Sequence, residues 1–251
     1  MHPRRLYAHR GASAERPENT MPAFERAIEV GVDALEMDVH LTHDAQLIVA
    51  HDDTAQRTCG AMLAWADLDL ADAQALDAGW GFVAPDGSRP FAGRGIGVPR
   101  FEDVLLAFPD VQINVDLKGD HAVDIMLELL RRHGAEHRVT LASFQLRTLV
   151  QVRRRGYAGE TGLSQSEIAS LLGMPGVLWR QLPLTGTAAQ VPTHYGAVRF
   201  DRPAFIAKCH SLGLRVDFWT VDDRAEAARL LELGADGIMT NDPAAIAPVF
   251  A

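Results

Sequence analysis

Helix-like segments of this chain repeatedly end at a glycine, and a short apolar run follows at once. The order recurs at Gly31, Gly134, Gly156, Gly213 and Gly234. Glycine just past a helix relieves the left-handed geometry of the C-cap. Helix followed by strand, repeated along a chain, is the pattern of parallel sheets with crossover helices. The rhythm therefore predicts an α/β fold, either a β/α barrel or a doubly wound sheet.

The strand count favours the barrel. Candidate strands lie at 5–9, 34–41, 47–51, 111–117, 139–143, 160–164, 197–200, 214–219 and 237–240, one more than eight. No G-x-G-x-x-G opens the chain, which disfavours a dinucleotide-binding sheet. A chain of 251 residues suits one barrel domain. We therefore predict a single TIM (β/α)8 barrel over residues 1–251, with one short run outside the closed sheet.

Residues 53–97 break the rhythm and predict a small insertion after the third strand. They contain one amphipathic candidate helix, residues 67–78, capped by Gly79, and then a tract rich in glycine and proline. We expect this insertion to lie over the carboxyl-terminal mouth of the barrel. The alternative is a surface loop without a catalytic part.

Two carboxylates stand together on the second candidate strand. Glu36 and Asp38 are two residues apart in A-L-E-M-D-V, so the alternation of a strand directs both side chains to one face. The link to the next run is too short for a parallel crossover, so a hairpin is expected. With residues 44–45 as a two-residue turn, His51 falls opposite Asp38 on that same face.

A second charged pair lies on the run 111–117 and just beyond it. Asp116 and Lys118 are again two residues apart, at the carboxyl end of an apolar strand. Charged groups placed there are costly to bury unless something pairs with them. A cation and a phosphate would supply such partners. Carboxylates are hard oxygen ligands suited to Mg²⁺ or Ca²⁺, and Arg10 with Lys118 offers donors to phosphate oxygens.

An ordered set of motifs resembles the glycerophosphodiester phosphodiesterase family over nearly the whole chain. The motifs are H-R-G at 9–11, P-E-N-T at 17–20, E-M-D-V at 36–39, T-x-D at 42–44, H-D-x-T at 51–54, R-T at 57–58, L-D-A-G at 76–79, V-P-R-F-E-D-V-L at 98–105, N-V-D-L-K at 114–118, S-F at 143–144, W-T-V at 219–221 and G-A-D-G-I-M-T-N-D-P at 234–243. The resemblance also implies the barrel.

The resemblance implies metal-dependent hydrolysis of a glycerophosphodiester to sn-glycerol 3-phosphate and an alcohol such as choline or ethanolamine. His9 and His51 would divide the proton transfers, since imidazole titrates near neutral pH. The glycerol 2-hydroxyl would attack first and give a cyclic phosphate that water opens. The insertion would cover the glycerol side of the pocket.

The other expected roles follow from the same motifs. The divalent ion, Mg²⁺ or Ca²⁺, would be held by Glu36, Asp38 and Asp116, where the family usually has glutamate at the third position. With one methylene less at Asp116, we expect either a longer distance to the ion or a water between them, and the preferred ion could change. Trp219 is either a wall for the glyceryl part or a core residue. Glu36 and Asp38 could instead form a structural ion cluster with Arg10.

Three other functions stay open. A phospholipase D-like enzyme would act on lysophospholipids, although the long insertion and H-D-x-T argue against it. A binding protein would keep the pocket without turnover. An unrelated barrel enzyme, such as an isomerase with a carboxylate-held metal, would need the motif order to be coincidence.

Composition limits the partners. A formal charge of −9 argues against a nucleic-acid binder. No apolar run reaches the eighteen or so residues that span a bilayer, and no signal peptide is evident, so we expect a cytoplasmic protein without stable membrane insertion. Cys59 and Cys209 lack metal or redox spacing and are expected to be reduced thiols. The oligomeric state is left undecided.

The remaining polar motif residues receive structural roles first. Glu18 and Asn19 precede a helix expected at 20–30, and Asn19 or Thr20 would be a good N-cap. The other eight histidines are expected on the surface or as satisfied core residues.

Overall fold

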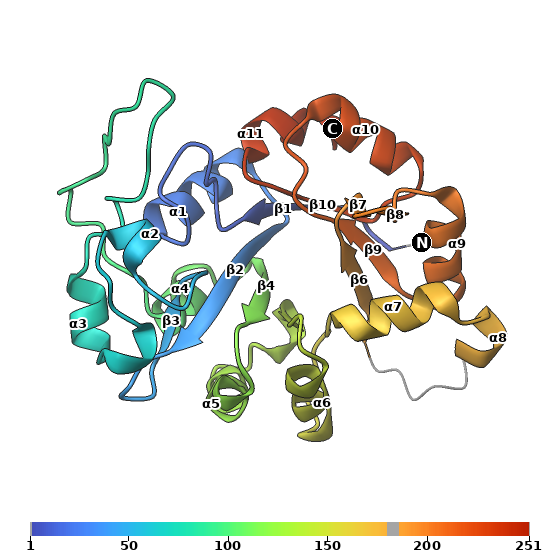
Figure 1. Cartoon of the computed structure of the whole chain (residues 1–251), viewed down its shortest axis with the longest axis horizontal. Helices are drawn as coiled ribbons and strands as arrows, with labels where there is room; N and C mark the ends of the chain where they lie inside the picture. The colour runs from blue at the N-terminus through green and yellow to red at the C-terminus, as the bar shows by residue number, and fades with distance from the viewer. Residues whose placement is uncertain (1, 180–185, 251) are drawn as a thin grey trace.

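The computed structural model describes residues 2–179 and 186–250. Within them, seven parallel strands form one curled sheet in the order β5-β4-β2-β1-β10-β9-β6 (Figure 1). The strands are β1 (Arg5–His9), β2 (Ala34–Leu41), β4 (Gln112–Leu117), β5 (Val139–Ala142), β6 (Ala188–Val191), β9 (Arg215–Phe218) and β10 (Gly237–Thr240). Because all of them run the same way, their carboxyl ends meet at one rim.

Residues 161–162 join the two edges of this sheet. Thr161 forms a parallel bridge with Leu141 of β5, and Gly162 forms one with Ala188 of β6. They act as a very short eighth strand at the predicted run 160–164. The predicted TIM barrel is therefore confirmed.

Two of the nine candidate runs lie outside the ring. The run 197–200 belongs to a small antiparallel hairpin, β7 (His194–Tyr195) with β8 (Val198–Arg199). The run 47–51 forms β3 (Leu47–Val49), which pairs antiparallel with β2. The other seven runs lie in the ring, and its remaining strand is β6, which the sequence pattern did not predict. Its sequence, A-A-Q-V, has a single β-branched residue and so lacks the usual strand composition.

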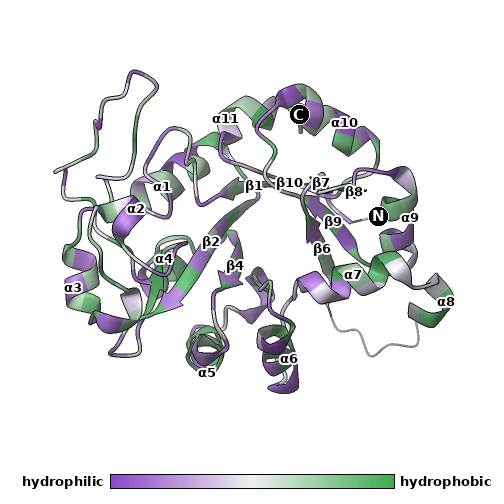
Figure 2. Ribbon diagram, in the orientation of Figure 1, coloured by the Kyte–Doolittle hydropathy of each residue, from purple (hydrophilic) through white to green (hydrophobic). Residues whose placement is uncertain are grey.

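Helices surround the strands (Figure 1). They are α1 (Met21–Val30), α4 (Phe101–Ala107), α5 (Val123–Arg132), α6 (Leu146–Arg154), α7 (Gln165–Gly173), α8 (Gly176–Trp179), α9 (Pro203–Ser211), α10 (Arg224–Glu232) and α11 (Pro243–Ile246). Many carry both hydrophobic and hydrophilic residues (Figure 2). Two buried apolar clusters pack between helices and sheet, one around Phe24, Leu35 and Leu127, the other around Ile206, Val216 and Leu230. Helix α1 ends as expected, with Gly31 at a φ of 87°.

The inner face of the barrel is polar near its amino-terminal end. Because Leu6, Val216 and Phe218 pack outward against helices, the alternating residues Tyr7 and Asp217 face inward. Arg215 Nη2 donates to Asp217 Oδ1 at 3.0 Å, and the Tyr7 hydroxyl donates to Asp217 Oδ2 at 3.3 Å. These buried groups pair with one another, although Arg215 Nε has no hydrogen-bond partner among the described residues.

The β2–β3 hairpin differs from the predicted one by one residue. Val39 pairs with Val49, and the loop has three residues, 43–45, with Ala45 at a φ of 59°. This is the three-residue hairpin in which a left-handed residue follows a turn. Asp38 therefore lies opposite Ala50, and the Ala50 N–H donates to the Asp38 carbonyl oxygen at 3.0 Å. The predicted pairing of His51 with Asp38 was wrong.

The insertion 53–97 lies beside β2 and β3 (Figure 1). Its elements are α2 (Gln56–Cys59), a 3-10 turn η1 (Trp65–Asp67) and α3 (Leu70–Ala75), so the single helix predicted at 67–78 is in fact shorter and Gly79 does not cap it. Trp65 and Ala73 form a separate apolar cluster with Ile48 of β3. No helix in residues 2–179 and 186–250 is long and apolar enough to cross a membrane.

Candidate active site

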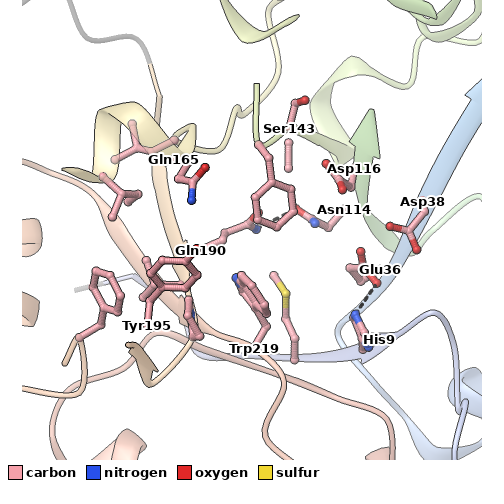
Figure 3. A pocket seen from close by; sticks show the side chains of 18 of the residues that line it. His9, Glu36, Asp38, Asn114, Asp116, Ser143, Gln165, Gln190, Tyr195 and Trp219 are labelled. Carbon is pink, nitrogen blue, oxygen red and sulfur yellow. Dashed lines mark hydrogen bonds and ion pairs between the residues drawn. The ribbon is translucent and has the colours of Figure 1, made fainter. Parts of the chain in front are cut away.

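A cavity of about 400 Å³ opens at the carboxyl ends of the strands. Its charged lining residues are His9, Arg10, Glu36, Asp38, His51, Asp116 and Lys118. Figure 3 shows His9, Glu36, Asp38 and Asp116 on one side of the cavity, with Gln165, Tyr195 and Trp219 on the other. All eight residues predicted for the site, Trp219 included, thus line one cavity.

His9 ends β1 and is held by Asn241. The His9 Nδ1 lies 2.8 Å from Asn241 Oδ1, and Asn241 uses its amide nitrogen on Asp222. The Asn241 oxygen is therefore the acceptor, and Nδ1 of His9 carries the proton. His9 Nε2 lies 3.8 Å from Glu36 Oε2. Burial, together with the Arg10 charge, lowers the pKa of His9 below its ordinary value, so this ring is neutral at neutral pH with Nε2 free to accept a proton.

Glu36 is a buried carboxylate, and among the residues that the structure describes no Lys or Arg side chain lies within ion-pair distance of it. It is 5% exposed, and its Oε2 accepts the backbone N–H of Arg10 at 3.0 Å. Arg10 adopts a φ of 57°, and its N–H also donates to the Glu36 carbonyl oxygen at 3.0 Å. Burial and the neighbouring Asp38 carboxylate raise the pKa of Glu36 well above its ordinary value. Glu36 is the group in the site that most needs a positive charge.

Asp38 is the best-paired carboxylate of the site. Its oxygens lie 2.6 Å from Lys118 Nζ and 3.2 Å from Arg10 Nε. The Asn19 amide donates to it at 3.1 Å. Burial works against ionisation, but Lys118 and Arg10 outweigh it and hold the pKa of Asp38 below its ordinary value. Arg10 thus pairs with Asp38, as expected for the alternative in which Glu36 and Asp38 form a structural ion cluster with Arg10.

Lys118 lies between two carboxylates. Its ammonium is 2.6 Å from Asp38 and 2.6 Å from Asp116, which faces Asp38 in the register of β2 and β4. Burial disfavours the charge, yet these two neighbours raise the pKa of Lys118. Burial raises the pKa of Asp116, although Lys118 opposes the shift. In this arrangement the lysine neutralises the carboxylates that were predicted to hold a metal.

The donor set suits a hard divalent cation, but the three side chains do not close around one point. Within residues 2–179 and 186–250, no three His, Cys, Asp or Glu side chains are grouped closely enough to hold a metal ion. Glu36 and Asp38 nevertheless project from the same strand into the cavity, and Asp116 faces Asp38. Three buried carboxylate groups, one of them without a Lys or Arg partner in the described part of the chain, match the chemistry that Mg²⁺ or Ca²⁺ prefers.

His51 is held through the insertion. Its Nδ1 lies 2.6 Å from Asp52 Oδ1, and Arg57 of α2 donates to Asp52 at 2.7 Å. The same guanidinium donates twice to Glu18, at 2.6 and 2.8 Å, and Glu18 accepts from Arg10 at 3.0 Å. Burial tends to raise the pKa of Asp52, but Arg57 and His51 hold it at about 2. A chain of ion pairs and hydrogen bonds through Asp52, Arg57 and Glu18 therefore connects His51 with Arg10.

The insertion was expected to cover the glycerol side of the pocket, but it does not line the cavity. The described residues that line the cavity include none from 53–97. Its contribution comes through Arg57, and the wall opposite the carboxylates comes from later segments. Trp219 lines the cavity and stacks edge-to-face with Phe144, at 5.9 Å between ring centroids. Trp219 also packs against the buried cluster of Tyr7, Ala34 and Met239, so its part as a wall for the glyceryl group stays a prediction.

Some polar groups of the site were not predicted. Asn114 lines the cavity opposite Glu36 and accepts from Gln190 at 2.8 Å. The alternation 114, 116, 118 could have revealed Asn114, but Gln190 lies on the unpredicted β6. Asn19 or Thr20 was expected to be the N-cap. The N-cap is Thr20, and no side-chain hydrogen bond caps the helix. The side chain of Asn19 binds Asp38 instead.

Carboxylates, a guanidinium, an ammonium and two imidazoles at the carboxyl-terminal rim of a barrel define an enzyme with acid–base groups and an anion-binding mouth. The model of the glycerophosphoryl diester phosphodiesterase family matches residues 9–245. The chain therefore belongs to this enzyme family.

Relatives cover nearly the whole chain. A glycerophosphodiester phosphodiesterase of Caldanaerobacter subterraneus subsp. tengcongensis is 30% identical over 247 residues, which cover 95% of this chain and 94% of that protein. A human lysophospholipase D is 26% identical over 94% of this chain and 82% of that protein. The putative glycerophosphoryl diester phosphodiesterase of Silicibacter pomeroyi has a TM-score of 0.80 at 25% identity, covering 99% of this chain and 93% of that one.

A further solved relative carries a ligand. A phosphodiesterase of Oleispira antarctica, in complex with the product sn-glycerol-3-phosphate, has a TM-score of 0.81 at 21% identity and covers 99% of this chain and 96% of that one. At this identity the likeness concerns the fold.

Proposed function

We propose that this chain hydrolyses glycerophosphodiesters to sn-glycerol 3-phosphate and an alcohol such as choline or ethanolamine. The observation that carries the proposal is the convergence of His9, His51 and Arg10 with the buried carboxylates in one cavity. The names of the relatives and the product bound to the Oleispira antarctica protein support the same chemistry.

His9 and His51 divide the proton transfers in this proposal. Each ring has its Nδ1 fixed by a neighbour, His9 by Asn241 and His51 by Asp52. Fixing one nitrogen sets the orientation of the ring and leaves Nε2 as the atom that exchanges a proton with the substrate. One histidine removes the proton of the attacking hydroxyl, and the other protonates the leaving alcohol.

Positive charge is needed where the phosphoryl oxygens become more negative. Arg10 at the end of β1 and Lys118 at the end of β4 both line the cavity and would stabilise that charge. A Mg²⁺ or Ca²⁺ ion held by Glu36, Asp38 and Asp116 would supply further positive charge beside the phosphoryl group. It would also replace the neutralising role of Lys118, so that this ammonium could turn to the phosphate.

A coupled assay tests the proposal directly. Release of glycerol 3-phosphate from glycerophosphocholine is followed with and without a chelator, and Mg²⁺ or Ca²⁺ is then restored. Turnover that stops with chelator and returns with one ion supports both hydrolysis and the ion. Turnover that ignores the chelator removes the ion from the proposal. Binding of glycerophosphocholine without turnover would identify a binding protein instead.

A further inference from the structure

Two side-chain amides form a polar pair at the floor of the cavity. Gln190 of β6 donates from Nε2 to Oδ1 of Asn114 on β4 at 2.8 Å, and both residues line the cavity. Figure 3 shows this floor pair with Glu36 and Asp116 on one side of it and Tyr195 on the other. The proposed reaction gives neither amide a part in the proton transfers or in holding the ion. The floor pair is thus a neutral polar site that the chemistry of the reaction leaves unused.

The floor pair lies below the groups proposed to bind the phosphoryl group. Asn114 precedes Asp116 by two residues on β4, so it lies about 7 Å further from the carboxyl-terminal rim. Arg10 and Lys118, in contrast, directly follow the last residues of β1 and β4. A substrate that is held at the rim by its phosphoryl group therefore reaches the floor pair with a part that carries no phosphate.

The floor pair has hydrogen-bonding groups to spare. A side-chain amide has one oxygen that accepts and one nitrogen that donates twice. The bond within the pair uses Asn114 Oδ1 and one N–H of Gln190. Within residues 2–179 and 186–250, Asn114 Nδ2 and Gln190 Oε1 form no further hydrogen bond. Asn114 is only 3% exposed, so leaving its amide unpaired in the cavity costs free energy unless a ligand or water binds there.

We infer that Asn114 and Gln190 bind the free primary hydroxyl of the glycerol moiety and so make the enzyme select glycerol over diols that lack this group. The inference rests on the proposed function and names the residues that recognise its substrate. A hydroxyl both donates and accepts, so it can donate to Gln190 Oε1 and accept from Asn114 Nδ2. The secondary hydroxyl lies nearer the phosphorus and stays free to attack it.

The other groups of the substrate match the floor pair less well. A phosphoryl oxygen only accepts, so it would leave Gln190 Oε1 unpaired. The ammonium of ethanolamine only donates, so it would leave Asn114 Nδ2 unpaired. Choline, once esterified, has neither a hydroxyl nor an N–H group. A water molecule also satisfies both amides, and the tests below separate it from the glycerol hydroxyl.

The first test compares two substrates of the wild-type protein. One is glycerophosphocholine, and the other is 2-hydroxypropyl phosphocholine, which lacks the primary hydroxyl but keeps the hydroxyl beside the phosphoester. Release of choline is followed for both. We expect kcat/KM to be at least about tenfold lower for the analogue, because it leaves buried amides unpaired. Equal values would overturn this inference and leave the proposed hydrolysis standing, whereas no choline from either substrate would overturn the proposed function as well.

The second test removes the amides. Gln190→Met and Asn114→Leu keep the approximate size of each side chain but cannot form its hydrogen bonds. We expect the ratio of kcat/KM for glycerophosphocholine over the analogue to fall at least about tenfold in each, with the value for the analogue nearly unchanged. Gln151→Met is the matched control, because Gln151 of α6 donates its amide to Asp120 at 2.8 Å but does not line the cavity. It should keep the wild-type ratio.

Two results of this second test would overturn the inference. Wild-type ratios in both floor variants, with the thermal midpoint retained, would place recognition of the hydroxyl elsewhere. An equal loss on both substrates would show that the amides only shape the floor of the barrel.

A structure of the wild-type protein with glycerol 3-phosphate tests the placement even if a floor variant does not fold. The primary hydroxyl is expected within about 3.2 Å of Asn114 Nδ2 and Gln190 Oε1. A product whose primary hydroxyl points away from the floor, with water on the two amides instead, would overturn the inference.

Discussion

At the scale of single residues, the two imidazoles of the cavity carry the sharpest prediction. His9→Ala or His51→Ala should lower kcat by about 10²- to 10⁴-fold, the usual contribution of one positioned acid or base. The fold should persist, because neither ring belongs to an apolar cluster of the described core. Steady-state kinetics and a thermal melt measure the two effects. His43→Ala is the control, since His43 is exposed and pairs with Asp69. Near-normal turnover in either variant would remove that histidine from the mechanism.

Glu36 provides a test of the ion that does not depend on turnover. Binding of Mg²⁺ or Ca²⁺ to the folded state should raise the thermal midpoint, and saturation at 100 times Kd corresponds to about 2.7 kcal/mol. Glu36→Gln should abolish this rise, because the amide keeps the size but not the charge. Asp110→Asn, at an exposed carboxylate, should retain it. A midpoint that no divalent ion shifts in the wild-type protein would count against the metal site.

The site residues that could be predicted from the sequence are those that follow the alternation of a strand. Glu36 with Asp38, and Asp116 with Lys118, were predicted as pairs on one face, and all four line the cavity. The partner of Lys118 was not predictable, because the choice between carboxylates and phosphate depends on distances of a few ångströms. The contact of Asn19 with Asp38 was missed for a similar reason. An asparagine before a helix is usually a cap, and its φ of 55° is known only from the structure.

At the scale of elements, helix α2 connects the insertion to the chemistry through Arg57. Arg57→Gln removes the hydrogen bonds to Asp52 and Glu18, which orient His51 and Arg10. We expect kcat to fall about 10- to 100-fold, as when groups behind a catalytic ligand are lost. Arg57→Lys should recover only part of this loss, because an ammonium cannot reproduce the fork of a guanidinium. Kinetics of both variants provide the measurement.

The control for Arg57 is a guanidinium of similar exposure. Arg155 pairs with Asp124 through two nitrogens, and neither residue lines the cavity. Arg155→Gln should therefore leave kcat and KM unchanged. Wild-type kinetics for Arg57→Gln would show that the insertion does not position the site.

Elements with regular patterns were predictable, and those set by local irregularity were not. The glycine-ended helices and apolar runs indicated β1, β2, β4, β5, β9 and β10. The hairpin register failed because Ala45 takes a left-handed φ that its residue type does not announce. Strand β6 was missed because A-A-Q-V has a single β-branched residue, and its pairing with β9 joins residues that are distant in the sequence.

At the scale of the whole molecule, the closed barrel has to satisfy the buried charges that its inner face carries. The Arg215 and Asp217 side chains are 2% and 0% exposed. Burial raises the pKa of Asp217, while Arg215 opposes that shift. Removing the arginine alone should leave a buried carboxylate without its counter-charge. The pair lies away from the cavity rim, so stability and activity can be measured separately.

Arg215→Met should therefore lower the free energy of unfolding by about 3–5 kcal/mol at pH 7, as measured with denaturant. The remaining carboxyl has a folded-state pKa above its unfolded value, so stability is lost as pH rises, and the deficit should shrink toward pH 4. The double variant Arg215→Met with Asp217→Leu should regain much of the loss, because no charge remains buried. Additive losses in the double variant, or a deficit independent of pH, would show that the pair does not govern the stability of the barrel.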